Sequence, residues 1–126
     1  MSRDVQTLIR LLGMVAGETQ HRYRAEVLGI FGSYVRGEQR EASDLDVLVR
    51  FAPGATLFDL VGLADFLEET LGVRVDVVPV DALREEIRDR ILQEAVSVDR
   101  KGSPGVEPSG GTLRLKPRFH NSIEVY

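Results

Sequence analysis

The sequence predicts a small α/β domain, in which helices cover one side of a mixed sheet of about three strands. Two features of the chain predict this class. Segments with apolar residues at helical spacing alternate with short runs rich in Val, Ile and Leu, and Gly or Pro stands at the joints between them. The length of 126 residues, that of a single domain, limits the number of such elements.

The chain opens with a helix and a strand. Residues 5–15 carry apolar side chains at helical spacing, which predicts an amphipathic helix. The polar run of residues 18–26 fits either a second helix or a loop. Residues 27–31 form a short apolar run that ends at Gly32, which is typical of a buried strand.

A tight connection leads to the second strand. Residues 33–36 fit a single helical turn that is closed by Gly37. Residues 44–51, which are followed by a Pro-Gly turn, predict the second strand. Because too few residues separate the two strands for a helical crossover, we expect them to be antiparallel neighbours.

The remaining elements are a helix, a strand and a helix. Thr56 followed by Asp59 resembles a capping box, and Gly72 fits the end of the helix that this box begins. Residues 73–80 are rich in Val and predict the third strand. Residues 83–96 predict the final helix because their apolar positions recur every four residues.

The composition changes near Asp99. Up to that residue 11 arginines stand against 18 acidic residues, a net charge of −7, whereas residues 100–126 carry a net charge of +3. Residues 101–111 are rich in Gly, Pro and Ser and show no periodicity, as in a flexible linker. We therefore expect one folded domain over residues 1–99 and a flexible, disordered tail over residues 100–126.

The residue content excludes several kinds of site. The sequence has no cysteine, so disulfides, thiolate metal sites and cysteine nucleophiles are excluded, and its two histidines disfavour a zinc site. No stretch has the apolar length of a membrane span, and the N-terminus lacks a signal peptide's apolar run, which predicts a cytoplasmic protein. The acidic body argues against sequence-specific nucleic-acid binding, although it permits a nucleotide bound through divalent cations.

Asp44 and Asp46 are the first candidates for chemistry. On a strand both side chains project from one face, while the apolar residues beside them point toward a core. Two neighbouring carboxylates repel each other unless one is protonated or a cation lies between them, and such oxygen ligands suit Mg²⁺. The alternative is the solvent face of a half-exposed strand. Because Asp is disfavoured in strands, this pair at the start of an apolar strand favours the metal site.

Gly32 and Ser33 are candidates for phosphate binding. Glycine lets a phosphate approach the backbone, and Ser33 offers its amide and hydroxyl at the start of a helical turn. A Gly-Ser pair after a strand also occurs in ordinary tight turns. The acids that follow favour phosphate binding, because a phosphate cradle and metal ligands must converge on one triphosphate.

Two further residues are candidates for nucleotide binding. Arg36 lies one helical turn beyond the Gly-Ser pair, where it reaches a phosphate or else pairs with Glu38 or Glu41. Ser43 either orients Asp44 or simply belongs to a turn.

Asp76 is the third candidate acid. It interrupts the apolar strand of residues 73–80, where an isolated buried carboxylate would be costly. If this strand lies beside the second, Asp76 joins Asp44 and Asp46 in a cluster that holds two metal ions for in-line nucleotidyl transfer, with Asp76 as base or second-metal ligand. The alternative is an exposed position on an edge strand. Arg74 would face the same side, where it contacts substrate or neutralises the cluster.

These motifs resemble those of the DNA polymerase β-type nucleotidyltransferase superfamily. The segment from Phe31 to Gly37 reads Phe-Gly-Ser-Tyr-Val-Arg-Gly, and Ser43–Asp46 reads Ser-Asp-Leu-Asp, with Asp76 in a later strand. Over residues 5–98 the chain is most similar to the minimal nucleotidyltransferases, the MntA-like antitoxins. The resemblance implies a polymerase β-like core in which the Gly-Ser motif holds the nucleotide phosphates and the three acids bind Mg²⁺. It also implies transfer of AMP from ATP to a tyrosine of a HEPN-type (HepT-like) toxin.

We therefore expect an Mg²⁺-dependent enzyme that transfers AMP from ATP to a partner protein and acts as an antitoxin. One alternative is a catalytically idle nucleotide-binding module that neutralises its partner by contact alone. Another is a transferase acting on a small molecule, which the short chain disfavours because no segment remains to build an acceptor pocket. For the same reason we expect the domain to borrow surface from a partner protein or from a second copy of itself.

Overall fold

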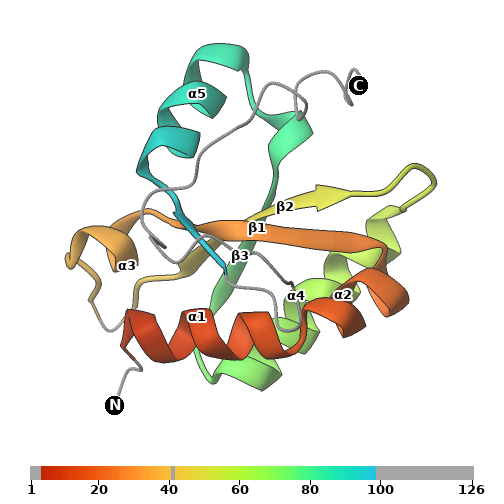
Figure 1. Cartoon of the computed structure of the whole chain (residues 1–126), viewed down its shortest axis with the longest axis horizontal. Helices are drawn as coiled ribbons and strands as arrows, with labels where there is room; N and C mark the ends of the chain where they lie inside the picture. Colours follow the sequence, from red (N-terminus) through yellow and green to blue (C-terminus); the bar gives the residue numbers. More distant parts are fainter. Residues whose placement is uncertain (1–3, 41, 99–126) are drawn as a thin grey trace, which may run out of the picture.

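The computed structural model describes residues 4–40 and 42–98 of the chain (Figure 1). Its elements are, in order, α1 (Val5–Met14), α2 (Ala16–Tyr23), β1 (Ala25–Phe31), α3 (Ser33–Arg36), β2 (Leu45–Phe51), α4 (Leu57–Leu71), β3 (Val75–Pro79), the 3-10 helix η1 (Val80–Ala82), α5 (Glu85–Glu94) and β4 (Val96–Ser97). The polar run that fitted a helix or a loop forms α2 and the start of β1. Within these ranges no helix has the length and apolar content needed to cross a membrane. The predicted tail, residues 100–126, lies outside the described residues.

Local signals in the sequence set the ends of the long helices. Asp4 caps α1 because its carboxylate accepts a hydrogen bond of 2.7 Å from the amide of Thr7. At the start of α4 the amide of Thr56 donates to the carboxylate of Asp59 over 2.9 Å, which confirms the predicted capping box. Gly72, with a φ angle of 73°, ends α4 as predicted.

The four strands form one sheet in the order β3-β2-β1-β4. β1 and β2 are antiparallel neighbours, as predicted, and α4 carries the chain across to β3, which lies parallel to β2. The prediction of about three strands missed β4, because two residues are too few to show a pattern. β4 approaches β1 closely at Gly29, where a Cβ atom would lie 2.5 Å from the carbonyl oxygen of Val96.

β1 contains one residue more than its ladder with β2 requires. The register shifts between Val27 and Gly29, so Leu28 forms a β-bulge. Beyond the bulge the ladder resumes and sets Phe31, the last residue of β1, opposite Asp46 of β2.

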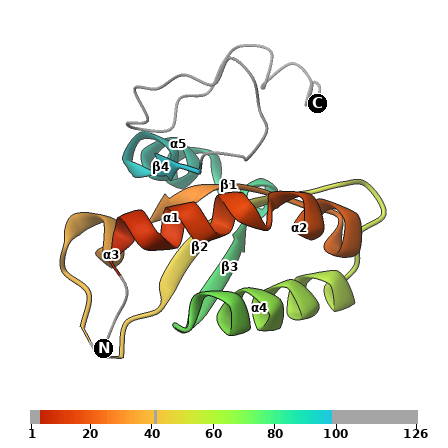
Figure 2. The ribbon, with the colours of Figure 1, turned by 60° about the horizontal axis from the view of Figure 1, so that its bottom comes forward.

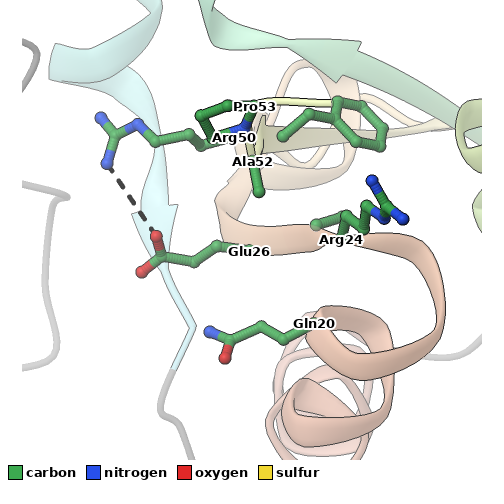
Figure 3. A pocket seen from close by; sticks show the side chains of 8 residues that line it. Gln20, Arg24, Glu26, Arg50, Ala52 and Pro53 are labelled. Atoms are coloured by element: carbon green, nitrogen blue, oxygen red, sulfur yellow. Dashed lines mark ion pairs between the residues drawn. The ribbon is translucent and has the colours of Figure 1, made fainter. Parts of the chain in front are cut away.

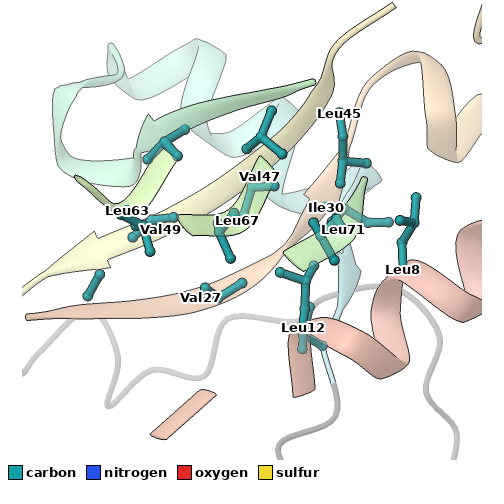
Figure 4. Close-up of a cluster of buried hydrophobic side chains, with 14 of the residues drawn as sticks. Leu8, Leu12, Val27, Ile30, Leu45, Val47, Val49, Leu63, Leu67 and Leu71 are labelled. Carbon is teal, nitrogen blue, oxygen red and sulfur yellow. The ribbon is translucent and has the colours of Figure 1, made fainter. Parts of the chain in front are cut away.

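Apolar side chains cover both faces of the sheet. The larger cluster lies between one face and helices α1 and α4. Its fully buried members include Leu8, Leu12, Ile30, Leu45, Val47, Val49, Leu63, Leu67 and Leu71 (Figure 4). A smaller cluster on the opposite face includes Leu28, Phe31 and Leu48 of the sheet with Leu92 and Ala95 at the end of α5. Figure 2 shows α4 and α5 on opposite sides of the sheet.

This arrangement corrects one detail of the predicted fold. The α/β class is confirmed, but helices lie on both sides of the sheet rather than on one. The physical reason is visible in the strands themselves, since residues 27–31 and 47–49 are apolar without alternation. Such runs are typical of strands that are buried on both faces.

The predicted ranges of the third strand and the last helix also differ from the structure. β3 begins at Val75 rather than at residue 73, and the chain continues from it into η1. The last helix covers Glu85–Glu94 rather than residues 83–96, because the backbone becomes extended at Ala95 and enters β4.

Candidate active site

The predicted phosphate loop and two of the predicted acids meet at one end of the sheet. Gly32 follows the last residue of β1, and Ser33 begins α3. Asp46 of β2 lies opposite Phe31 of β1 on one side and opposite Asp76 of β3 on the other. Neighbouring strands are about 5 Å apart, so the loop and both acids are side by side. The third strand thus lies beside the second, which is the condition for Asp76 to join Asp46.

Asp46 and Asp76 project from the face of the sheet that carries α5. The residues on either side of each acid belong to the larger apolar cluster on the opposite face, and they are Leu45, Val47, Val75 and Val77. Asp44 stands one residue before β2 rather than inside the strand. It is half-buried like Asp46, whereas Asp76 is exposed.

Asp46 is the electrostatic centre of the group. Burial, followed by repulsion from the nearby carboxylates of Asp76 and Asp44, raises the pKa of its carboxyl group to about 6. A hydrogen bond with the side chain of Asp76 also raises the pKa, whereas the guanidinium of Arg36 lowers it. The three acids therefore act on one another, and Asp46 gains most from a proton or a cation.

Asp44 has a carboxylate oxygen that no hydrogen bond satisfies. Its Oδ1 atom is sealed from solvent and lacks a hydrogen-bond partner among the described residues. The Nε atom of Arg74 lies 3.2 Å from this oxygen, which makes an ion pair, but not in hydrogen-bond geometry. The sequence left open whether Arg74 contacts substrate or neutralises the acids, and here it neutralises Asp44.

Gly32 brings the backbone of the loop against Asp46. Its φ angle of 85° and ψ angle of −154° lie in a region that side chains rarely permit. A Cβ atom built on Gly32 would collide with Oδ2 of Asp46. The carbonyl of Gly32 accepts hydrogen bonds of 3.1 Å from the amides of Val35 and Arg36, which fixes the single turn of α3. The missing side chain thus lets the loop close onto the acid.

The two remaining predicted residues have partners within the protein. Arg36 is exposed and pairs with Glu38 through Nε at 2.9 Å and with Glu94 of α5 through Nη1 at 3.4 Å. The hydroxyl of Ser43 accepts a hydrogen bond of 2.8 Å from the amide of Arg40, which closes a turn just before Asp44. Sequence reasoning anticipated Glu38 but missed Glu94, because nothing in the sequence relates residues that are 58 positions apart.

The acids suit a divalent cation by their chemistry. Within residues 4–40 and 42–98, no three acidic or histidine side chains are already placed to hold a metal ion together. However, the unsatisfied Oδ1 of Asp44 and the mutual repulsion centred on Asp46 are both relieved by a cation. Mg²⁺ is commonly bound by one or two carboxylates and completes its coordination with waters and substrate phosphates, so these residues fit it.

A hollow of about 350 Å³ lies at the opposite end of β1 and β2 (Figure 3). It is lined by Gln20, Arg24, Ala25, Glu26, Arg50, Phe51, Ala52 and Pro53, and it contains an ion pair of 3.9 Å between Arg50 and Glu26. None of the predicted site residues lines this hollow. The candidate active site is therefore the end of the sheet around Gly32 and Asp46, away from this hollow.

Comparison with known proteins gives the family of the chain. Residues 14–98 match the nucleotidyltransferase domain family. The chain is 42% identical over 81 residues to the protein adenylyltransferase MntA of Thermococcus cleftensis, a match that covers 64% of this chain and 82% of that protein. A solved structure described as a "putative minimal nucleotidyltransferase" is 42% identical, with a TM-score of 0.64, and the match covers 75% of this chain and 95% of that one.

A second solved structure shares the fold at lower identity. It is described as a toxin-antitoxin with AMP-PNP, is 21% identical, has a TM-score of 0.54, and the match covers 68% of this chain and 70% of that one. The family match spans more than half of the chain and includes Gly32, Asp46 and Asp76. The chain is thus an enzyme of the nucleotidyltransferase domain family, similar to the minimal nucleotidyltransferases.

Proposed function

We propose that this enzyme transfers AMP from ATP to a protein acceptor, with Mg²⁺ as its metal. The acceptor is a HEPN-type toxin that the modification neutralises, so the enzyme acts as an antitoxin in the cytoplasm. The observation that carries the proposal is the pairing of Asp46 with Asp76 on adjacent strands, directly beside Gly32. The name of the MntA relative and the toxin-antitoxin structure with AMP-PNP support the choice of reaction and partner.

The reaction exchanges a phosphoanhydride bond of ATP for a phosphodiester bond to the acceptor. The hydroxyl oxygen of the acceptor, a tyrosine by family resemblance, forms a bond to the α-phosphorus of ATP. The bond between that phosphorus and the leaving oxygen breaks, and pyrophosphate departs with its electron pair. The proton of the hydroxyl passes to the carboxylate of Asp76, which is exposed toward an incoming acceptor. Mg²⁺, when bound, neutralises the phosphate charge and favours the ionised hydroxyl.

The other residues bind and position the nucleotide. Asp44, Asp46 and Asp76 hold the metal ions, of which we propose two. Gly32 and Ser33 hold the phosphates through the loop that closes against Asp46. We propose that Arg36 and Ser43 assist from the rim, where Arg36 would exchange a carboxylate partner for a phosphate.

The test is transfer of label from ATP carrying radioactive α-phosphate to a purified HEPN-type protein. Asp76→Asn is expected to keep most of its Mg·ATP binding and to lose transfer, whereas Asp44→Asn loses both. Ser33→Ala should weaken ATP binding by about 1–2 kcal/mol, the value of one hydrogen bond to a charged group. Asp89→Asn, an exposed acid on α5, is the matched control and should change neither property.

Two outcomes would overturn the proposal. Transfer by Asp76→Asn at the wild-type rate removes this acid from the reaction. A wild-type enzyme that neutralises the HEPN-type protein without labelling it is an idle binding module instead. Calorimetric titration of ATP with and without Mg²⁺ tests the metal directly: we expect Mg²⁺ to strengthen ATP binding and Asp46→Asn to abolish this gain.

A further inference from the structure

Arg74 is a positive charge held at the edge of the candidate metal ligands. Its Nε atom lies 3.2 Å from Oδ1 of Asp44, and its backbone carbonyl accepts a hydrogen bond of 2.7 Å from the amide of Leu45. The main chain and the side chain of Arg74 thus both contact the start of β2, next to the register pair of Asp46 and Asp76. Because arginine stays protonated at physiological pH, this cation is permanent.

Arg74 differs from Arg36, another cation that acts on these acids. Arg36 pairs with Glu38 and Glu94, which are not among the predicted metal ligands. In the part of the chain that the structure describes, Arg74 forms its ion pair with Asp44 alone. A metal ion that binds Asp44 therefore takes this partner from Arg74, whereas Arg36 keeps its own partners.

The oxygen that Arg74 faces is closed to a metal ion in this conformation. Oδ1 of Asp44 is sealed from solvent, although the side chain as a whole is 43% exposed. A metal ion reaches this atom only when a neighbouring group moves. The side chain of Arg74 is 70% exposed, and an exposed ion pair contributes little to stability. Arg74 is therefore the neighbour that can move at little cost.

The charge that accompanies the metal determines how favourable this movement is. Bare Mg²⁺ at Asp44 would leave two cations side by side, the metal ion and the released guanidinium of Arg74. Mg·ATP carries a net negative charge, so the released guanidinium meets phosphate oxygens instead, and its planar fork of N–H donors suits them. The exchange is thus unfavourable for the bare ion and favourable for the complex.

Phosphates bound at the proposed loop come within reach of Arg74. The loop lies against Asp46, since a Cβ atom on Gly32 would collide with Oδ2 of that acid. Asp46 lies two residues beyond Asp44, about 7 Å along the chain, and Arg74 already contacts Asp44. A shift of that size carries the guanidinium from the carboxylate to a phosphate oxygen.

We infer that Arg74 is a positioning residue that selects Mg·ATP over bare Mg²⁺. It holds Asp44 in place before the ligand arrives, and it passes to the phosphates when the metal binds that carboxylate. This inference rests on the proposed function for the metal and the nucleotide, but not for the acceptor protein. Removal of Arg74 should therefore change two affinities in opposite directions, with tighter binding of Mg²⁺ alone and weaker binding of Mg·ATP.

The test measures both affinities with the full-length enzyme, that for Mg²⁺ alone by NMR titration and that for Mg·ATP by calorimetry. We expect Arg74→Gln to bind Mg²⁺ alone up to about fivefold more tightly, the range of an exposed ion pair, and to bind Mg·ATP about two- to fivefold more weakly. Arg74→Lys keeps the charge and should stay closer to the wild type in both. Arg90→Gln removes the same charge from an exposed position on α5 and should change neither affinity.

Two further measurements locate the competition at Asp44. In an Asp44→Asn background, Arg74→Gln should no longer strengthen the binding of Mg²⁺ alone, because the carboxylate for which the cations compete is gone. The Nε–H signal of Arg74, identified by its absence in Arg74→Gln, should shift when Mg·ATP is added to the wild type. The corresponding signal of Arg22, which pairs with Glu18 on α2, should not shift. A gain in Mg²⁺ affinity that persists in the Asp44→Asn background would overturn the inference, because it would be a general effect of charge.

The outcomes separate this inference from the proposed function. If the wild type transfers AMP to the HEPN-type protein, but Arg74→Gln changes both affinities in the same direction or changes neither, the inference fails and the function stands. If the two affinities move in opposite directions, but the wild type transfers no AMP to that protein, the proposed acceptor fails and the role of Arg74 stands.

Discussion

Gly32 allows the loop between β1 and α3 to lie against the carboxylate of Asp46. Its φ angle of 85° and the collision of a Cβ atom with Asp46 both oppose any side chain. We expect Gly32→Ala to lower the free energy of unfolding by about 1–3 kcal/mol, through backbone strain and displacement of the loop. ATP binding should weaken in parallel. Urea unfolding and calorimetric titration measure the two effects.

Gly17→Ala is the matched control for this substitution. Gly17 lies in α2, and a Cβ atom there would have no heavy atom within 4 Å. Alanine in a helix is preferred over glycine, so this variant should gain up to about 1 kcal/mol of stability and keep its ATP affinity. Equal behaviour of the two variants would show that Gly32 has no special role.

The second prediction at this scale concerns pH and Asp46. In the folded protein its pKa is raised from 3.8 to about 6, so the folded state binds this proton more tightly than the unfolded state does. The contribution of Asp46 to stability is therefore complete below about pH 4 and is lost as the pH rises through about 6. In EDTA, Asp46→Asn should melt at a higher temperature than the wild type at neutral pH, and this advantage should vanish near pH 4.

The comparison with Asp89→Asn separates this effect from a general loss of negative charge. Asp89 is exposed on α5, and its substitution should leave the difference from the wild type independent of pH. Excess Mg²⁺ should reduce the advantage of Asp46→Asn at neutral pH, because the cation stabilises the wild type. An advantage that persists unchanged at pH 4 would contradict the assignment.

At the scale of elements, α5 covers the second face of the sheet and buries its apolar side chains. Leu92 is 5% exposed and packs with Leu48 and Phe31, which are the strand residues nearest the active site on that face. We expect Leu92→Ala to lower the free energy of unfolding by about 2–4 kcal/mol, because it leaves a cavity under the helix. Chemical denaturation provides the measurement, and the neighbouring Gln93→Ala, which is exposed, should change stability by less than about 0.5 kcal/mol. A loss of similar size for both would mean that α5 does not seal this face.

The sequence predicts most elements because their signals are local. The capping box at Thr56 and Asp59 and the glycine at 72 mark both ends of α4, and the short loop between β1 and β2 requires antiparallel neighbours. β4 is invisible because its two residues are a strand only through their pairing with Gly29. The sequence also does not show that α5 covers the second face of the sheet. The apolar spacing of α5 predicts a helix, but it does not indicate which face of the sheet the helix packs against.

In the candidate site, too, local sequence signals predict some features, whereas tertiary contacts decide others. From the sequence, Asp76 joins Asp46 only if the third strand lies beside the second, and the parallel register of β2 and β3 meets this condition. The sequence does not show that Arg74 pairs with Asp44 or that Glu94 reaches Arg36, because these contacts depend on the geometry of exposed side chains. The docking of α3 against Asp46 likewise depends on the loop conformation at Gly32.

At the scale of the whole molecule, the last prediction concerns residues 100–126. Their Gly-, Pro- and Ser-rich beginning offers too little apolar surface to offset the entropy of ordering. We expect a chain that ends at Asp99 to melt within about 2 °C of the full chain, far less than the shift caused by 1 kcal/mol in a domain of this size. Its ATP affinity should also be unchanged. A large drop in melting temperature would show that this segment packs on the domain.

The bulge at Leu28 gives β1 one spare residue, and this sets how the strand can change its length as the enzyme evolves. If Leu28 were deleted, Val27 and Gly29 would still stand opposite Val49 and Leu48, so the ladder would become regular and Phe31 would stay opposite Asp46. The loss of a second residue could not be absorbed in this way: it would shift Phe31 along β2 and turn the side chains beyond the deletion to the other face of the sheet. Among related enzymes, β1 should therefore occur with one residue fewer and no bulge, but not with two residues fewer.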